Sequence, residues 1–201
     1  MKLDAESLKA AARARLADAR TNPLFWRGVA LFIAVVALDQ ATKMWILHGL
    51  ALAPGQSIDL SSVFDLTYVQ NTGVSFGLLS GGWARWILTV FSVAVAAGLL
   101  VWLTEAQRLL PALGVGLIAG GAFGNAIDRF FYGYVVDFLD FSGLGFVWVF
   151  NVADAGINVG VAALILDAIL HREDGAAGFD APPGDGVHDQ SSKGSQQDRR
   201  V

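Results

Sequence analysis

The sequence predicts an all-α membrane protein with four transmembrane helices, a small extracytoplasmic β-sheet and an amphipathic segment at the membrane interface. Three observations predict this class. Of its 201 residues, 54% are hydrophobic and 16% are charged, against about 25% charged in soluble domains. Four apolar segments are each long enough to cross a bilayer, which needs ~20 residues. Tryptophans stand near the segment ends, as is typical of membrane interfaces.

The four predicted spans are 28–47, 83–103, 109–127 and 150–170. Eleven of the fourteen Lys and Arg residues precede the first span, lie between the second and third, or follow the fourth. Because basic residues are retained in the cytoplasm, both termini are expected there. The long connections, about 49–82 and 130–149, then lie on the outer side of the membrane.

The chain ends are polar. Residues 1–27 form the predicted cytoplasmic N-terminal extension, with a helix over 4–20 that Asn22-Pro23 stops. Residues 171–201, rich in Gly, Asp, Ser and Gln, form a predicted disordered cytoplasmic tail. The first span is not a cleaved signal peptide on this interpretation, because Asp39 and Lys43 interrupt its apolar run.

Each outer connection has a pattern of its own. Residues 57–60 and 63–70 are β-prone around a Ser61-Ser62 turn, which predicts a small sheet within 49–82. Residues 130–149 mix aromatics, glycines and acids, which suits an amphipathic segment at the interface. The glycines of the third span are interpreted as packing positions, since small residues let helices approach closely.

Composition excludes several kinds of site. There is no cysteine, so disulfides, thiol nucleophiles and thiolate metal sites are ruled out. The three histidines are far apart in the sequence, and we expect no metal and no cofactor. A net charge of −4 without a basic stripe argues against nucleic acid as a partner.

Ionisable and amide side chains cluster toward the outer half of the spans, where their cost in lipid usually marks function. The cluster comprises Asp39, Lys43, Asn125, Asp128, Arg129, Asn151, Asp154 and Asn158, with Asp137 and Asp140 in the connection before the fourth span. The alternative interpretation is that these groups only hold the helices together. That alternative is weakest for Asp154, a carboxylate with no adjacent cation in the sequence. Asp167, near the inner end of the fourth span, is interpreted as structural.

The sequence offers candidate residues for two kinds of hydrolase. Residues 73–77 match the G-x-S-x-G pattern of a serine nucleophile, but only His48 lies on the correct side to act as base. A pair of carboxyl groups sharing one proton is the alternative, as in an aspartic peptidase, and it needs no metal. Composition alone does not choose the pair among Asp128, Asp137, Asp140 and Asp154.

Four blocks of sequence together resemble one family, lipoprotein signal peptidase (signal peptidase II). The blocks are DQATK at 39–43, NTGVSFG at 71–77, GGAFGNAIDR at 120–129 running on to VVDF at 135–138, and FNVAD at 150–154. The resemblance covers about residues 28–170, which would form the four-span peptidase domain. The long polar ends and the short, glycine-rich stretch between Asp137 and Asp154 depart from the core pattern.

The resemblance implies an intramembrane aspartic endopeptidase that cuts diacylglyceryl-modified prolipoproteins before the lipidated cysteine. It implies catalytic Asp137 and Asp154, and substrate-binding or site-shaping Asn71, Asn125, Arg129 and Asn151. It implies supporting roles for Asp39, Lys43, Asp128 and Gly121. The outer sheet would be the family's β-cradle, and 130–149 its lid-like segment. We therefore expect a monomer in the bacterial cytoplasmic (inner) membrane, in contact with prolipoprotein and lipid, with its active site near the outer face.

Two other functions use the same carboxylates. A small proton- or cation-coupled transporter would carry ions on them, although spans one and two share no motif with spans three and four, and so give no sign of an internal repeat. A non-enzymatic assembly factor would use them only to hold helices together, and would tolerate Asn at position 154.

Overall fold

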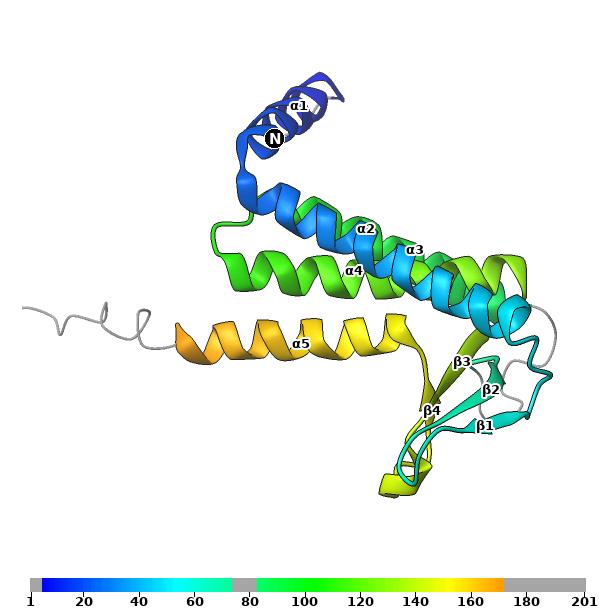
Figure 1. Ribbon diagram of the computed structural model, residues 1–201. Helices are drawn as coiled ribbons and strands as arrows, with labels where there is room; N and C mark the ends of the chain where they lie inside the picture. The colour runs from blue at the N-terminus through cyan, green and yellow to red at the C-terminus, as the bar shows by residue number, and fades with distance from the viewer. Residues whose placement is uncertain (1–4, 74–82, 172–201) are drawn as a thin grey trace, which may run out of the picture. The chain divides into compact units, whose positions relative to one another are not determined.

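The computed structural model describes residues 5–73 and 83–171, and both Ser75 and the predicted tail beyond His171 lie outside them. The elements in chain order are α1 (Ala5–Thr21), α2 (Pro23–Met44), η1 (Trp45–Gly49), β1 (Ser57–Asp59), β2 (Asp65–Asn71), α3 (Trp83–Leu103), α4 (Leu109–Phe131), β3 (Val135–Asp140), η2 (Ser142–Leu144), β4 (Val149–Phe150) and α5 (Val152–Leu170). Among the described residues, four helical segments are long and apolar enough to cross a membrane. The predicted fold class, four spanning helices with a small sheet, is confirmed (Figure 1).

The first span begins earlier than predicted and ends in a different kind of helix. Asn22 caps α2, its side-chain oxygen accepting from the Leu24 N–H at 2.9 Å, and Pro23 occupies the first helical position. The Asn22 amide also donates to the Ala106 carbonyl oxygen, at 2.8 Å, in the connection between α3 and α4. After Met44 the chain continues as the π-helical turn η1, which carries the span to Gly49.

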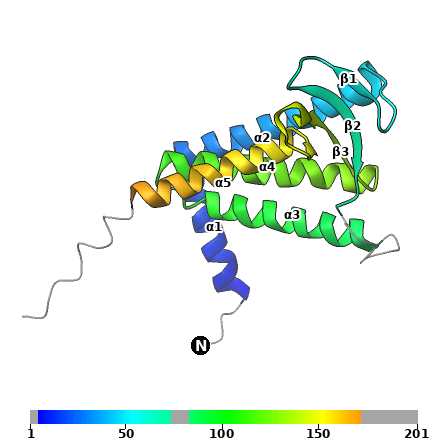
Figure 2. The same ribbon diagram turned by 90° about the horizontal axis from the view of Figure 1, so that it is seen from below.

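Helix α4 is the central helix of the bundle. It packs against α2, α3 and α5, whereas α2 and α3 barely touch each other (Figures 1 and 2). Its glycines allow this approach, because a Cβ atom at Gly121 would lie 2.2 Å from the Ala153 oxygen and one at Gly116 2.4 Å from the Gly28 oxygen. The helix also ends one turn beyond the predicted span, so Asp128 lies within its last helical turn.

The sheet is antiparallel, with the strand order β1-β2-β3-β4. The two strands predicted in the first connection are observed as β1 and β2. The second connection, expected to be only an amphipathic segment, contributes β3 and β4. The physical reason is the apolar stretch at the start of β3, where Val136 and Phe138 are buried with Leu66 and Tyr68 against Ile46 of η1. This core fixes the sheet to the end of the first span.

The close approach of α4 to α5 gives a first prediction. Gly121→Ala should lower the melting temperature of the detergent-purified protein, because the added methyl group meets the backbone oxygen of Ala153. Gly98→Ala in α3 is the matched control, since a Cβ atom there meets nothing within 4 Å and alanine favours helix. The measurement is thermal unfolding of both variants. Equal melting temperatures for wild type and Gly121→Ala would contradict the packing described.

Candidate active site

The centre of the polar cluster is the buried ammonium group of Lys43. Its Nζ lies 2.8 Å from Oδ2 of Asp39 and 2.8 Å from Oδ2 of Asp128. It also donates to Oδ1 of Asn125 at 3.1 Å. Lys43 is 1% exposed, and both carboxylates are fully buried. Because an isolated buried charge is costly, the ion pairs and hydrogen bonds together hold α2 against α4.

The two carboxylates paired with Lys43 extend the cluster to other elements. Oδ1 of Asp39 accepts from the Ala153 N–H at 3.0 Å, at the first turn of α5. Oδ2 of Asp128 accepts from the Val136 N–H at 3.0 Å, in β3. Each carboxylate therefore accepts from a backbone N–H of another element, and at Ala153 that donor is one of the first-turn N–H groups that have no partner within the helix. Sheet and helix are thus tied to the same ion-pair cluster.

Asn151 and Asp154 form a reciprocal cap at the start of α5. The Asn151 side-chain oxygen accepts from the Asp154 N–H at 2.9 Å, and Oδ2 of Asp154 accepts from the Asn151 N–H at 3.3 Å. This is the capping-box arrangement, and the acidic residue in the first turn is favoured by the helix dipole. The FNVAD block is therefore a helix start that fixes the Asp154 carboxylate in place.

Asp137 is held by two amides from different elements. It lies on β3 opposite Val69 of β2 and is 1% exposed. Asn71, at the end of β2, donates to its Oδ2 at 2.9 Å, and Asn151 donates to its Oδ1 at 2.7 Å. Asp154 receives a comparable bond, from the Asn125 amide to its Oδ1 at 2.8 Å.

Each of the three amides has its orientation fixed by a separate donor. Lys43 can only donate, so Oδ1 of Asn125 faces it and the amide nitrogen faces Asp154. The Asp154 N–H fixes Asn151 in the same way, turning its nitrogen toward Asp137. The Gly73 N–H donates to Oδ1 of Asn71 at 2.8 Å and directs that nitrogen to Asp137 as well. The amide donors are thus preorganised around the two carboxyl groups.

The tight turn after β2 needs its glycine. Gly73 has a φ of +71°, a conformation that L side chains rarely adopt, and a Cβ atom there would lie 3.6 Å from an Nη atom of Arg129. Arg129 donates to the Asn125 carbonyl oxygen at 3.4 Å, and its Nε is a buried donor without a hydrogen-bond partner among the described residues. The guanidinium group therefore lies between the turn after Asn71 and the backbone carbonyl of Asn125, and its Nε–H has no hydrogen-bond acceptor among the described residues.

The two acids of the sheet strand β3 have opposite environments. Burial, and then the nearby charge of Asp154, raise the pKa of Asp137 to about 7, although the Asn71 and Asn151 amides partly lower it. At Asp140, the Thr67 hydroxyl, at 2.7 Å, and the Ser142 N–H hold the pKa of the carboxyl below its usual value. Asp140 lies outside the amide network. At neutral pH, Asp137 is therefore the acid on β3 that can retain a proton.

Two open cavities meet at the carboxyl groups. One, of about 420 Å³, is lined by Asp154 together with Asn71, Phe146, Trp148, Val149, Phe150, Ile157 and Asn158. The other, of about 410 Å³, is lined by Asp137 and by residues 69–73 and 147–149. Asn71, Trp148 and Val149 line both. The segment around Trp148 therefore forms a wall between an apolar cavity at Asp154 and a more polar one at Asp137.

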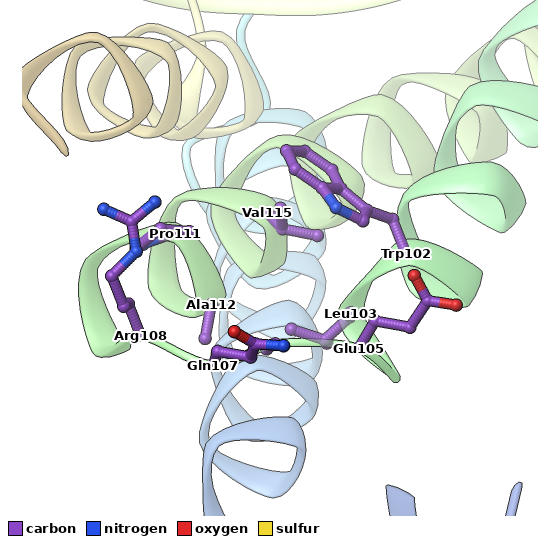
Figure 3. A pocket seen from close by; sticks show the side chains of 9 residues that line it. Trp102, Leu103, Glu105, Gln107, Arg108, Pro111, Ala112 and Val115 are labelled. Carbon is purple, nitrogen blue, oxygen red and sulfur yellow. The ribbon is translucent and has the colours of Figure 1, made fainter. Parts of the chain in front are cut away.

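A further pocket, of about 180 Å³, lies at the other end of α4 and is separate from this site (Figure 3). From Ala112, at that pocket, to Asp128 is roughly 24 Å along the helix, at ~1.5 Å per residue. Two charged residues that line it are already paired, Arg108 with Asp167 at 2.7 Å and Glu105 with Arg15 at 2.9 Å. These ion pairs join the connection between α3 and α4 to α5 and α1.

The structure brings nearly all the predicted site residues into one network. Asp39, Lys43, Asn71, Asn125, Asp128, Asp137, Asn151 and Asp154 are joined by the bonds described, and Arg129 and Gly121 line their surroundings. Gln40 is a member of the network that the sequence did not single out: its amide donates to Asp39 and Asp128 at 3.1 and 3.0 Å. Its place inside the DQATK block was the available signal.

The chain is similar to known proteins of one family. The family model for signal peptidase (SPase) II matches residues 31–170. The chain belongs to the signal peptidase II family. The lipoprotein signal peptidase of Caulobacter vibrioides is 53% identical over 150 residues, covering 74% of this chain and 89% of that protein. The corresponding protein of Synechocystis sp. is 45% identical over 149 residues, covering 72% and 86%.

A solved structure extends the similarity to three dimensions. A bacterial membrane enzyme determined by the in meso method at 2.3 Å resolution superposes with a TM-score of 0.64 at 27% identity, over 74% of this chain and 90% of that one. The signal peptidase II match includes every residue of the network around Lys43, Asp137 and Asp154. With four apolar helices and this family, the chain is a multi-pass membrane peptidase.

The raised pKa of Asp137 predicts how stability depends on pH. Between pH 3.8 and about 7, the Asp137 carboxyl is protonated in the folded protein and ionised in the unfolded chain. The free energy of unfolding therefore falls as pH rises through that window. Asp137→Asn removes the effect. The difference in unfolding free energy, variant minus wild type, should grow by about 2 kcal/mol from pH 5 to pH 7.5.

Asp140→Asn is the control for this measurement. The lowered pKa of Asp140 contributes stability that is complete above pH 3.8 and lost only in more acidic solution, so its difference from wild type should stay constant from pH 5 to pH 7.5. Unfolding followed in detergent at both pH values gives the comparison. A constant difference for Asp137→Asn as well would mean that Asp137 is ionised throughout.

Proposed function

We propose that the chain is an aspartic endopeptidase that cuts diacylglyceryl-modified prolipoproteins before the lipidated cysteine, with Asp137 and Asp154 as the catalytic pair. The observation that carries the proposal is that three oriented asparagine amides donate to these two acids. The Gln40 amide donates to Asp39 and Asp128 instead, and both of those carboxylates are paired with Lys43. Asp128 is committed to Lys43, and Asp140 lies outside the network. Membership of the signal peptidase II family supplies the substrate class.

In the proposed reaction, a water molecule lies between the two carboxyl groups. Asp154, ionised, takes a proton from the water as its oxygen attacks the scissile carbonyl carbon. Asp137 gives its proton to the carbonyl oxygen, which prevents charge from building up there. When the C–N bond breaks, Asp154 gives its proton to the leaving amine, and the second hydroxyl proton of the intermediate returns to Asp137. Both acids end as they began.

The proposed orientation places the site relative to the membrane and to the substrate. With both termini in the cytoplasm, the carboxyl groups lie near the outer face of the membrane, where the lipid anchor of a prolipoprotein meets water. The signal peptide would enter laterally between helices, and the sheet would act as the cradle for the chain beyond the cut. Residues 28–170 would be the catalytic domain, acting as a monomer in a bacterial inner membrane, without metal or cofactor.

Family membership favours cleavage over the transport or assembly roles that the carboxylates alone left open. In a transporter the same acids would exchange protons with solvent on both sides in turn, whereas here Asp137 is buried, Asp154 is half-buried, and both accept from amide donors at one end of the helices. The serine alternative rests on Ser75, which lies outside the described residues.

The assignment of the acids predicts a pattern of activity loss. Asp137→Asn and Asp154→Asn should each reduce cleavage of a diacylglyceryl-prolipoprotein by at least about 1,000-fold, because each removes one partner in proton transfer. Asp140→Asn should retain most activity. A gel-shift assay with purified protein in detergent measures this, and an unlipidated prolipoprotein is the matched substrate control. Loss of activity in Asp140→Asn comparable to that in Asp137→Asn would overturn the assignment.

The proton on Asp137 predicts a pH profile. Because its pKa is raised to about 7, kcat/KM should decline above that pH as the acid ionises. In Asn71→Ala, the amide that lowers the pKa of Asp137 is gone, so the alkaline limb should move to higher pH while the maximum rate falls. Initial rates from pH 5 to 9 on one lipidated substrate test both points. An alkaline limb that stays in place in Asn71→Ala would assign that limb to another group.

A further inference from the structure

One asparagine side chain has no hydrogen-bond partner among the described residues. The chain contains five asparagines, at 22, 71, 125, 151 and 158. Four are hydrogen bonded, to Ala106, Asp137 and Asp154 in the ways described. Among the residues that the structure describes, none is hydrogen bonded to the side chain of Asn158, which is exposed. Its amide is therefore not used to hold one helix against another.

Asn158 lies in the apolar cavity, beside one of the proposed catalytic acids. It is four residues after Asp154 on α5, which places the two side chains on one face about 6 Å apart along the helix axis. Both line the cavity of about 420 Å³, and most of its other walls are apolar, from Phe146, Trp148 and Ile157. The cavity thus carries a carboxylate at one level and an uncharged amide one turn farther along the spanning helix.

An amide at this depth has a cost that needs an explanation. A carboxamide without a hydrogen-bond partner is less stable in apolar surroundings than in water, because nothing replaces its hydrogen bonds to water. Valine or leucine would suit the same position, as at the exposed neighbours Val159 and Val161. An amide that faces the cavity, rather than another helix, is suited to a polar group that a ligand brings into it.

We propose that Asn158 is a substrate-binding residue, whose side-chain N–H donates to an uncharged carbonyl oxygen of the substrate one turn deeper in the membrane than the scissile bond. The inference rests on the proposed peptidase function. An amide suits a neutral acceptor, since it carries no charge to attract a phosphate or an ammonium group. A lipidated prolipoprotein offers two such acceptors there, an ester carbonyl of its diacylglyceryl group and an unpaired backbone carbonyl in the last turn of its signal helix.

The experiment uses two substrates and one pair of variants. The substrates are one prolipoprotein carrying either the ester-linked diacylglyceryl group or its dialkyl ether analogue, which has no carbonyl. For Asn158→Leu we expect KM to rise about three- to tenfold on the ester substrate with kcat nearly unchanged, as expected when one neutral hydrogen bond is lost from ground state and transition state alike. Asn158→Thr, which keeps a donor, should recover much of the loss.

The pattern of KM values tests the proposal and shows which carbonyl of the substrate is the acceptor. A rise on the ester substrate alone assigns the acceptor to the lipid, and a similar rise on both assigns it to the signal-peptide backbone. No rise on either substrate overturns the proposal. Val159→Leu, an exposed neighbour outside the cavity, is the control and should leave KM unchanged. Wild-type protein that cuts neither substrate would overturn the proposed function, and this inference with it.

Discussion

The ammonium group of Lys43 is buried between the carboxylates of Asp39 and Asp128, and four elements depend on its position. Helices α2 and α4 meet at the ion pairs themselves. Asp39 reaches the first turn of α5 and Asp128 reaches β3, so helix and strand are placed by the same charges. Removing one member of such a cluster leaves an uncompensated buried charge, which typically lowers the free energy of unfolding by ~3–5 kcal/mol. The ion pairs hold the surroundings of the carboxyl groups rigid.

This rigidity reaches the two acids through amides. Lys43, the Asp154 N–H and the Gly73 N–H each fix one asparagine oxygen, and the three amide nitrogens then face the carboxyl groups. Such donors need no rearrangement when a reaction proceeds, which is the most effective way for a protein to stabilise developing charge. The cavities on either side of Trp148 are open, so the rigid centre is flanked by surfaces with room for a ligand.

Hydrophobic length and charge were sufficient to predict the four spans, because a bilayer imposes a minimum length that few other structures need. The sequence motifs were sufficient to predict which residues form most of the network. The partners within it were not predictable, since the contact of Lys43 with Asp128 joins residues 85 positions apart and depends on how α4 crosses α2. Strands β3 and β4 were missed for a related reason. The apolar side chains of β3 bury against η1, and β4 pairs with β3, and local patterning contains neither contact.

The central place of α4 has a consequence for biosynthesis. The chain is made from its N-terminus, so α2 and α3 are complete before the helix that packs against both of them exists. During that interval Asp39 and Lys43 have neither Asp128 nor Asn125 beside them. Their spacing of four residues places them on one helix face, where they neutralise each other and lower the cost of entering lipid. The pair that later holds the elements of the finished enzyme together thus has an earlier role. While α2 enters the bilayer, each of the two side chains is the counter-ion of the other.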